Sequence, residues 1–221
     1  MLNTLLTPEE FDAHTENRTL RISFVGMSNC GKSYRSKILA RDSDFFWYRV
    51  DGDIQKSLDL ENEEEIASWL GYPTSPTYLE RERKYIELEN EFTGQAAMQS
   101  PGKNLVFDTT GSVIHLDSSV LGLLKENTLV VHLDVGDESL ENLIDQFFKM
   151  PKPVAWSGYF NQNEGESEES ALRRCYPILL TERLKRYRTL AHININSREL
   201  YDMSGNETLE IIRGKLKTGM L

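Results

Sequence analysis

The chain has 221 residues, of which 39% are hydrophobic, and it carries a formal net charge of −10. This length fits one α/β domain with a sizeable core. The acidic balance argues against a general nucleic-acid binder, although a local group of arginines and backbone N–H groups could still hold a phosphate. The two cysteines, Cys30 and Cys175, suggest neither a disulfide framework nor a metal site.

The sequence gives no sign of targeting to a membrane. Its start lacks a basic segment followed by a long apolar run, and no apolar stretch approaches the roughly 20 residues that span a bilayer. We therefore expect a cytoplasmic protein with no membrane or nucleic-acid partner. The expected partner is a small-molecule substrate, and the expected state is a monomer or a homodimer.

In chain order, the first predicted element is a short helix in an N-terminal extension over residues 1–19. Thr7, Pro8 and Glu10 match a helix start, with a capping threonine, a proline at the first position and a glutamate at the third. Apolar runs then predict strands, and periodic runs between them predict helices. The predicted strands cover 20–25, 45–50, 104–107, 129–133 and 191–195, and the helices 33–40, 137–149, 170–191 and 206–216.

Two longer segments interrupt this alternation. Residues 61–100 are rich in Glu, Leu and Lys and predict two helices that bind substrate, separated by a break at 71–76. The acidic stretch 156–170 predicts a mobile loop within a lid over 150–172. The alternation of strands and helices predicts a parallel sheet covered on both faces, in a single α/β domain over residues 1–221.

Residues 26–33, GMSNCGKS, match the phosphate-binding pattern G-x-x-x-x-G-K-[ST] between a strand and a helix. The glycines let successive N–H groups face phosphate oxygens, the lysine reaches the β- and γ-phosphates, and the serine hydroxyl binds Mg²⁺. Cys30 is either a small filler or a thiol activated by the helix N-terminus. The predicted nucleotide contacts are Gly26, Met27, Ser28, Asn29, Cys30, Gly31, Lys32, Ser33 and Tyr34.

Carboxylates follow the second and third predicted strands, at the sheet edge where ligands of parallel sheets bind. Asp51 and Asp53 flank Gly52, so that one could hold water around Mg²⁺ while the other takes a proton from a substrate hydroxyl. The alternative is an ordinary polar turn with Asp53 as a helix cap. Asp108 ends an apolar run and predicts a further metal-orienting group, again with a simple turn as the alternative.

Basic residues gather in the predicted helix near the C-terminus. Lys185 and Arg188 fit a solvated face, whereas Arg173, Arg183 and Arg186 could clamp a carboxylate or phosphate. Arg81 and Arg83 in the middle segment are similar candidates. Four aromatic residues of that segment could stack on a base, although core packing is favoured for them: Trp69, Tyr72, Tyr78 and Tyr85.

These motifs, in this order, resemble the shikimate kinase family, within the P-loop kinases related to nucleoside-monophosphate kinases. The resemblance covers about residues 20–216 and implies a five-stranded parallel sheet of order 2-3-1-4-5, flanked by helices, with a mobile lid. It also implies ATP and Mg²⁺. By this resemblance Asp51 serves the metal, Asp53 holds the acceptor hydroxyl, Lys152 is the basic lid residue, Arg183 binds a substrate carboxylate and Arg198 lies in the adenine loop.

The chain departs from that family at two places. The family has three glycines after the third strand, where this chain has Thr109, Thr110 and Gly111; we expect these three to bind substrate and the threonine side chains to crowd or bond the acceptor. The family's lid arginine is replaced by Lys152, which is a point charge rather than a fork.

Three functions are consistent with the sequence. The first is Mg-ATP-dependent phosphoryl transfer to a hydroxyl of a small, anionic metabolite, with Lys32, Asp53 and Lys152 as catalytic residues. The second is a nucleoside or nucleotide kinase, whose acceptor pocket must hold a base. The third is a catalytically weak ATP-binding regulator, which would bind ATP without turnover.

Overall fold

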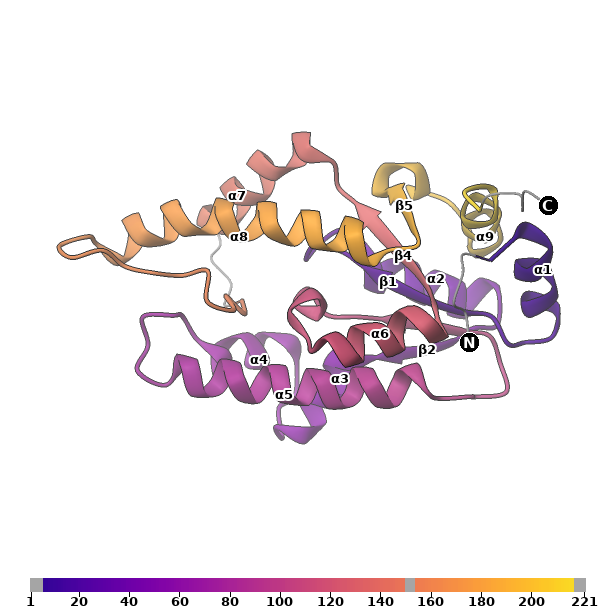
Figure 1. The fold of residues 1–221 in the computed structure, drawn as a ribbon, viewed down its shortest axis with the longest axis horizontal. Coiled ribbons are helices and arrows are strands. Elements are labelled where there is room, and N and C mark those ends of the chain that lie inside the picture. The colour runs from indigo at the N-terminus through magenta and orange to yellow at the C-terminus, as the bar shows by residue number, and fades with distance from the viewer. Residues whose placement is uncertain (1–5, 150–153, 217–221) are drawn as a thin grey trace.

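The structure, a computed structural model, describes residues 6–149 and 154–216. It contains a five-stranded sheet in the order β2-β3-β1-β4-β5, in which every neighbouring pair is parallel, with helices around it (Figure 1). The predicted α/β class and strand order are therefore confirmed. The strands are β1 (Arg21–Val25), β2 (Phe46–Arg49), β3 (Leu105–Asp108), β4 (Leu129–Asp134) and β5 (Ile193–Asn196).

Helices connect and cover these strands. The α-helices are α1 (Pro8–Glu16), α2 (Lys32–Asp42), α3 (Val50–Ser57), α4 (Glu63–Leu70), α5 (Tyr78–Ala97), α6 (Ser118–Asn127), α7 (Leu140–Lys149), α8 (Glu168–Leu190) and α9 (Gly205–Gly214). Short 3-10 turns are η1 (Val113–His115), η2 (Asp137–Ser139) and η3 (Ser197–Leu200). Within the described ranges, no helix combines the length and the apolar character that crossing a membrane requires.

The three central strands are buried along nearly their whole length. All four residues of β3 are buried, as are the last four of β1 and the first five of β4. Such continuous burial is expected for parallel strands with helices on both faces, because neither face meets water. The sheet is therefore a rigid base for whatever lies at its carboxyl edge.

The N-terminal helix α1 is bound to α9 by an ion pair. In α1, the Thr7 side chain and Glu10 form the predicted capping box. The guanidinium of Arg213 in α9 donates to both carboxylate oxygens of Asp12, at 2.6 and 2.7 Å. Helix α9 in turn packs against α2. The predicted appendage is thus fastened beside the helix that follows the phosphate-binding loop.

Three elements differ from the sequence prediction. Strand β2 ends at Arg49, and Asp51 and Asp53 lie in the first turn of α3, a helix that the sequence did not predict. Helix α6 was not predicted, because it begins with two serines and contains Gly122, which are weak helix formers. Helix α8 begins at Glu168 and continues through Pro177 to Leu190.

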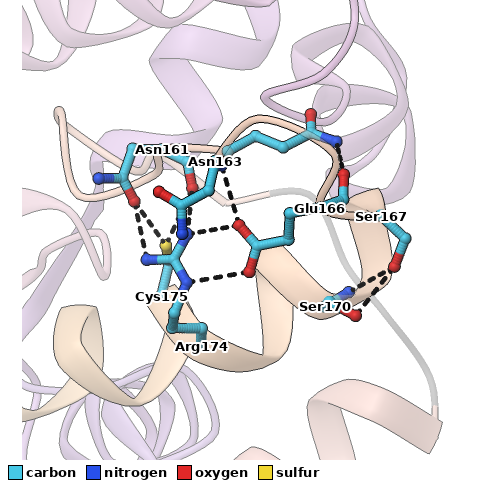
Figure 2. Close-up of polar contacts among 8 residues, drawn as sticks. Asn161, Asn163, Glu166, Ser167, Ser170, Arg174 and Cys175 are labelled. Carbon is cyan, nitrogen blue, oxygen red and sulfur yellow. Dashed lines mark hydrogen bonds and ion pairs between the residues drawn. The ribbon is translucent and has the colours of Figure 1, made fainter.

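The loop before α8 is held by its own side chains (Figure 2). Arg174 donates to both oxygens of Glu166, at 3.0 and 2.7 Å, and also to the side chain and the carbonyl of Asn161. The backbone N–H of Asn163 donates to Glu166 at 2.9 Å, and Ser167 caps α8. The loop predicted as mobile therefore has a defined fold, while its mobility stays a prediction.

Two glycines in helices provide a matched test of this packing. A Cβ at Gly205 would lie 2.8 Å from Cβ of Asp42 and 3.2 Å from the carbonyl of Ile38, whereas nothing lies within 4 Å of one at Gly94 in α5. We expect Gly205→Ala to lower the free energy of unfolding by about 1–3 kcal/mol. Gly94→Ala is expected to raise it by about 0.5–1 kcal/mol, because alanine favours the helix. Urea denaturation measures both, and equal effects would contradict the described packing of α9.

Candidate active site

The phosphate-binding loop leaves β1 through a glycine that no other residue can replace. Gly26 has φ 147°, and a Cβ there would lie 2.9 Å from the carbonyl oxygen of Leu133 in β4 and 2.8 Å from Sγ of Cys30. Gly31, with φ 97°, turns the chain into α2 in the left-handed region that other residues rarely adopt. The glycine spacing of the sequence pattern thus has a direct conformational cause.

The lysine of the loop lies inside this curl. The ammonium of Lys32 donates to the carbonyls of Gly26 at 2.8 Å and Met27 at 2.9 Å, and the residue is buried. Lys32 also lies at the start of α2, where the helix dipole places a partial positive charge beside the lysine's own charge. The loop is therefore arranged to receive an anion, with a cation that can turn from carbonyl oxygens to phosphate oxygens.

Asp108 at the end of β3 lies beside this loop. In the register of the sheet it pairs with Phe24 of β1 and Arg49 of β2, so three strand ends meet there. Burial raises the pKa of Asp108, and a hydrogen bond from Ser33 and the charge of Lys32 act against that rise. A hydroxyl and a carboxylate beside a phosphate site are the hard oxygen donors that Mg²⁺ takes together with phosphate and water, so the residues present fit this ion.

Cys30 is a packing residue of the loop. Its thiol is buried, and burial raises its pKa. Loss of solvent outweighs the positive neighbours, which favours the packing role over a thiol activated by the helix N-terminus.

A cavity of about 490 Å³, which we call the outer cavity, opens beside the phosphate-binding loop. Its walls include the predicted contacts Asn29, Gly31, Tyr34 and Arg198, together with Tyr201, which was not predicted. Tyr34 and Tyr201 are strongly exposed at 59% and 75%. Large exposed aromatic rings beside a phosphate-binding loop are suited to stacking on a planar base.

An inner cavity of about 170 Å³ lies between the loop and α4, α5 and α8. Ser28 of the loop, Asp51 of α3 and Arg183 of α8 form polar parts of its wall. Ile66 and Leu70 of α4 supply apolar parts. A phosphate-binding loop, a carboxylate and a guanidinium therefore converge on one space that also has an apolar side.

Arg183 is buried at 4% exposure, and its recorded partners are uncharged. Its Nη2 donates to the carbonyl of Ala155 at 2.5 Å, and its Nε donates to Nε2 of His115 at 3.3 Å. Burial and the charges of Arg183 and Arg186 lower the pKa of His115 to about 3, so the imidazole is neutral and can accept. Among the described residues, no carboxylate forms an ion pair with Arg183. A buried cation of this kind favours an anionic ligand.

Asp51 and Asp53 are directed to different surroundings. Asp51 lines the inner cavity and accepts a hydrogen bond from the hydroxyl of Tyr85 at 3.3 Å. Asp53 accepts from the hydroxyl of Tyr48 at 2.5 Å and from Lys56 at 3.1 Å, and is not part of the cavity wall. The first of the two carboxylates, rather than the second, is therefore the one beside a ligand in this cavity.

The two threonines after β3 both bond to the protein through their hydroxyls, and Thr110 also lines the inner cavity. The hydroxyl of Thr109 donates to the carbonyl of Phe24 at 2.7 Å, and that of Thr110 donates to Glu89. Both hydroxyls thus have protein partners, while Thr110 and Gly111 line the inner cavity, so contact between this loop and an acceptor stays a prediction. Gly111 lies close to Ser28 and Arg183: a Cβ there would be 3.1 Å from the Ser28 hydroxyl and 3.9 Å from the Arg183 guanidinium.

Other predicted residues lie elsewhere. The guanidinium of Arg81 donates to the carbonyl of Trp69 and stacks over its ring, and Arg83 is exposed. Neither lines the inner cavity. Arg173 is exposed and pairs with Glu169. Lys152, the predicted lid residue, lies outside the described residues.

Sequence reasoning missed a buried acid beneath the site. Glu89 has no exposure, and its carboxylate also accepts from the hydroxyl of Ser112 at 2.6 Å. It lies one helical turn after Tyr85, so both occupy one face of α5. That spacing was visible, but in a segment rich in glutamate nothing distinguished Glu89 from its exposed neighbours.

The similarity of this chain to known proteins is found at the level of structure. No protein-family model matches the sequence, and none of the curated proteins is significantly similar to it. Solved structures do match. Shikimate kinase from Acinetobacter baumannii, in complex with shikimate, has a TM-score of 0.61 at 21% identity, covering 94% of this chain and 99% of that one. The enzyme from Bacteroides thetaiotaomicron gives 0.58 at 18%, covering 88% and 97%.

Shikimate kinase from Aquifex aeolicus gives a TM-score of 0.56 at 20% identity, covering 87% of this chain and 94% of that one. At these identities the likeness concerns the fold. The predicted resemblance is confirmed at that level: the chain has the P-loop kinase fold found in shikimate kinases.

Glu89 predicts a measurable dependence of stability on pH. Burial raises its pKa from 4.5 to about 7, against the hydrogen bonds from Ser112 and Thr110 and the charge of Arg183, while Asp51 adds to the rise. Between these values the folded protein holds a proton that the unfolded chain releases. The contribution of Glu89 to stability is thus present below about pH 4.5 and lost as pH rises through about 7, by roughly 3 kcal/mol.

The test compares the wild type with Glu89→Gln, which does not titrate. From about pH 5 to pH 8, we expect the free energy of unfolding of the wild type to fall relative to the variant by up to roughly 3 kcal/mol. Urea denaturation at both pH values measures this difference. A difference that stays constant would show that Glu89 is charged throughout.

Proposed function

We propose that this protein is a Mg-ATP-dependent kinase that phosphorylates a hydroxyl of a small metabolite carrying a carboxylate. The observation that carries the proposal is the inner cavity, where the wall joins Ser28 of the phosphate-binding loop to the buried Arg183. A site for a phosphoryl donor and a site for an anionic acceptor thus share one space. The P-loop kinase fold supports the same conclusion.

The donor side follows from the phosphate-binding loop. Residues 26–33 and the start of α2 would hold the phosphates of ATP, and Lys32 would exchange its two carbonyl partners for phosphate oxygens. The base would lie in the outer cavity against Tyr34 and Tyr201. Ser33 and Asp108 would hold Mg²⁺, which neutralises charge on the phosphates when bound.

The acceptor side follows from the inner cavity. A single guanidinium balances a carboxylate, and the fork of Arg183 can bind both its oxygens. Asp51 would accept a hydrogen bond from the hydroxyl to be phosphorylated, and Ile66 and Leu70 would contact carbon atoms of the acceptor. This assigns to Asp51 the role that the family resemblance gives to Asp53.

The reaction is a single phosphoryl transfer. The acceptor oxygen forms a bond to the γ-phosphorus, the bond from that phosphorus to the bridging oxygen of ADP breaks, and the hydroxyl proton passes to Asp51. Positioning is the main task of the protein in such a reaction, because the transferred group needs an in-line approach more than covalent help.

The size of the inner cavity favours a small metabolite over a nucleoside. Its volume is about 170 Å³. A protein cavity of about 150 Å³ accommodates benzene. One ring or a chain of similar size therefore fits, which favours a small metabolite over the larger base and sugar of a nucleoside.

The primary test is a panel of acceptors. ATP binding is measured in the presence of Mg²⁺, and ADP release is followed with shikimate, other hydroxycarboxylates, sugars and nucleosides. We expect ATP binding and turnover with a hydroxycarboxylate. Failure to bind ATP-Mg²⁺ would sink the proposal, binding without any turnover would indicate a regulator, and turnover with nucleosides alone would indicate a nucleoside kinase.

The two carboxylates of α3 give a sharper prediction. We expect Asp51→Asn to lower kcat with the best acceptor of the panel by about 100-fold or more, because it removes the proton acceptor. Asp53→Asn is the matched control and should change kcat by less than about tenfold, since its partners lie outside the cavity. The reverse order would assign the acceptor hydroxyl to Asp53.

Arg183 is tested against another arginine of the same helix. We expect Arg183→Gln to lower kcat/KM for a carboxylate acceptor by about 30-fold to 1,000-fold, as expected when a buried charge pair loses one partner. ATP binding should stay unchanged. Arg173→Gln, at an exposed position of α8, should leave both unchanged. An unaltered kcat/KM in Arg183→Gln would exclude the guanidinium as the anion site.

A further inference from the structure

Glu89 is a fully buried carboxylate that the proposed reaction does not use. One of its oxygens accepts from the hydroxyl of Thr110, and the other accepts from the hydroxyl of Ser112 at 2.6 Å. The backbone N–H of Ser112 also donates to the hydroxyl of Thr110 at 3.1 Å. One carboxylate thus holds both ends of the three-residue turn 110–112, which we call the acceptor loop.

The acceptor loop lies between the two halves of the proposed site. Its middle residue, Gly111, is close to the hydroxyl of Ser28 on the donor side and to the guanidinium of Arg183 on the acceptor side. The carbonyl of Gly111 accepts from the hydroxyl of Tyr187, which is buried in α8. The position of the loop therefore sets the width of the inner cavity between the phosphate-binding loop and the anion site.

The same face of α5 also holds the carboxylate beside the acceptor hydroxyl. Tyr85, four residues before Glu89, donates to Asp51 at 3.3 Å. One face of α5 thus holds the acceptor loop through Glu89 and contacts Asp51 through Tyr85.

A merely structural role does not account for this arrangement. A buried carboxylate is costly to desolvate, and apolar side chains of similar shape often give equal or greater stability. Polar networks that are fully bonded do, however, fix one geometry where apolar packing permits several. Here the geometry that is fixed is the wall of the proposed acceptor site.

We propose that Glu89 is a positioning residue for the acceptor: it holds the loop Thr110–Ser112, which lines the proposed acceptor site, in the geometry that transfer requires. This inference rests on the proposed function. Because displacements of about 1 Å in an active site can lower rates by about 100-fold, we expect effects on the acceptor rather than on ATP.

Two variants and one control test this inference. Glu89→Gln keeps the shape but changes the bonding of both hydroxyls. The triple variant Glu89→Leu, Thr110→Val, Ser112→Ala removes the polar groups together, so that none is left buried without a partner. Thr128→Val is the control, because it breaks a buried hydroxyl pair with Ser23, at 2.7 Å, near the amino end of β4.

The kinetic arm uses the panel compound that gives the fastest ADP release with the wild type. In Glu89→Gln and in the triple variant we expect KM for that compound to rise by about tenfold or more, with KM for ATP within about twofold. The triple variant should melt near the wild-type temperature, and Thr128→Val should lower the melting temperature without changing either KM. A triple variant with wild-type stability and wild-type KM would overturn the positioning role.

A second arm needs no acceptor. Hydrogen exchange of the amides at 110–113 is measured with ATP-Mg²⁺ absent, and Glu89→Gln should accelerate it by about tenfold, since the loop loses its anchor. Unchanged exchange would show that Glu89 does not hold the loop, and would overturn the inference. If the wild type binds no ATP and phosphorylates no compound, the proposed function fails separately, while this arm still decides what Glu89 holds.

Discussion

The close approach of the backbone at Gly26 to β4 is the constraint on which the whole site depends. The chain passes so near the carbonyl of Leu133 that a single methyl group would separate them. This contact fixes the phosphate-binding loop to the sheet, and the parallel register then brings Asp108 and the start of α3 to the same edge. The donor side is thus rigid, since the strands beneath it are buried on both faces.

The acceptor side is built differently, from helices that converge on this fixed edge. Helix α5 contributes Tyr85 and Glu89 from one face, while α8 contributes Arg183, and Ala155 and His115 hold its guanidinium through uncharged atoms. Neutral partners leave the positive charge of Arg183 available to a ligand. Asp51, an acid that lines the cavity, accepts a hydrogen bond from the hydroxyl of Tyr85.

The sequence could predict those parts of the site whose interacting residues lie close together along the chain. Residues 26–33 were predictable because their spacing and their glycines act locally. Which of Asp51 and Asp53 lines the cavity could not be predicted without α3, since two successive steps along a helix rotate the side-chain direction by about 200°. The orientation of Thr110 depended on Glu89, 21 residues away, which no local pattern reveals. The sheet order followed from the family resemblance and was confirmed.

The loop before α8 has a consequence for how this protein would meet a ligand. Arg174, Glu166 and Asn161 hold the loop in one shape (Figure 2). Thr74, in the segment before α5, also donates to Glu168 at 2.5 Å. These contacts cost conformational entropy when the chain folds. A ligand that binds beside the loop therefore meets a surface that is already ordered by its own side chains.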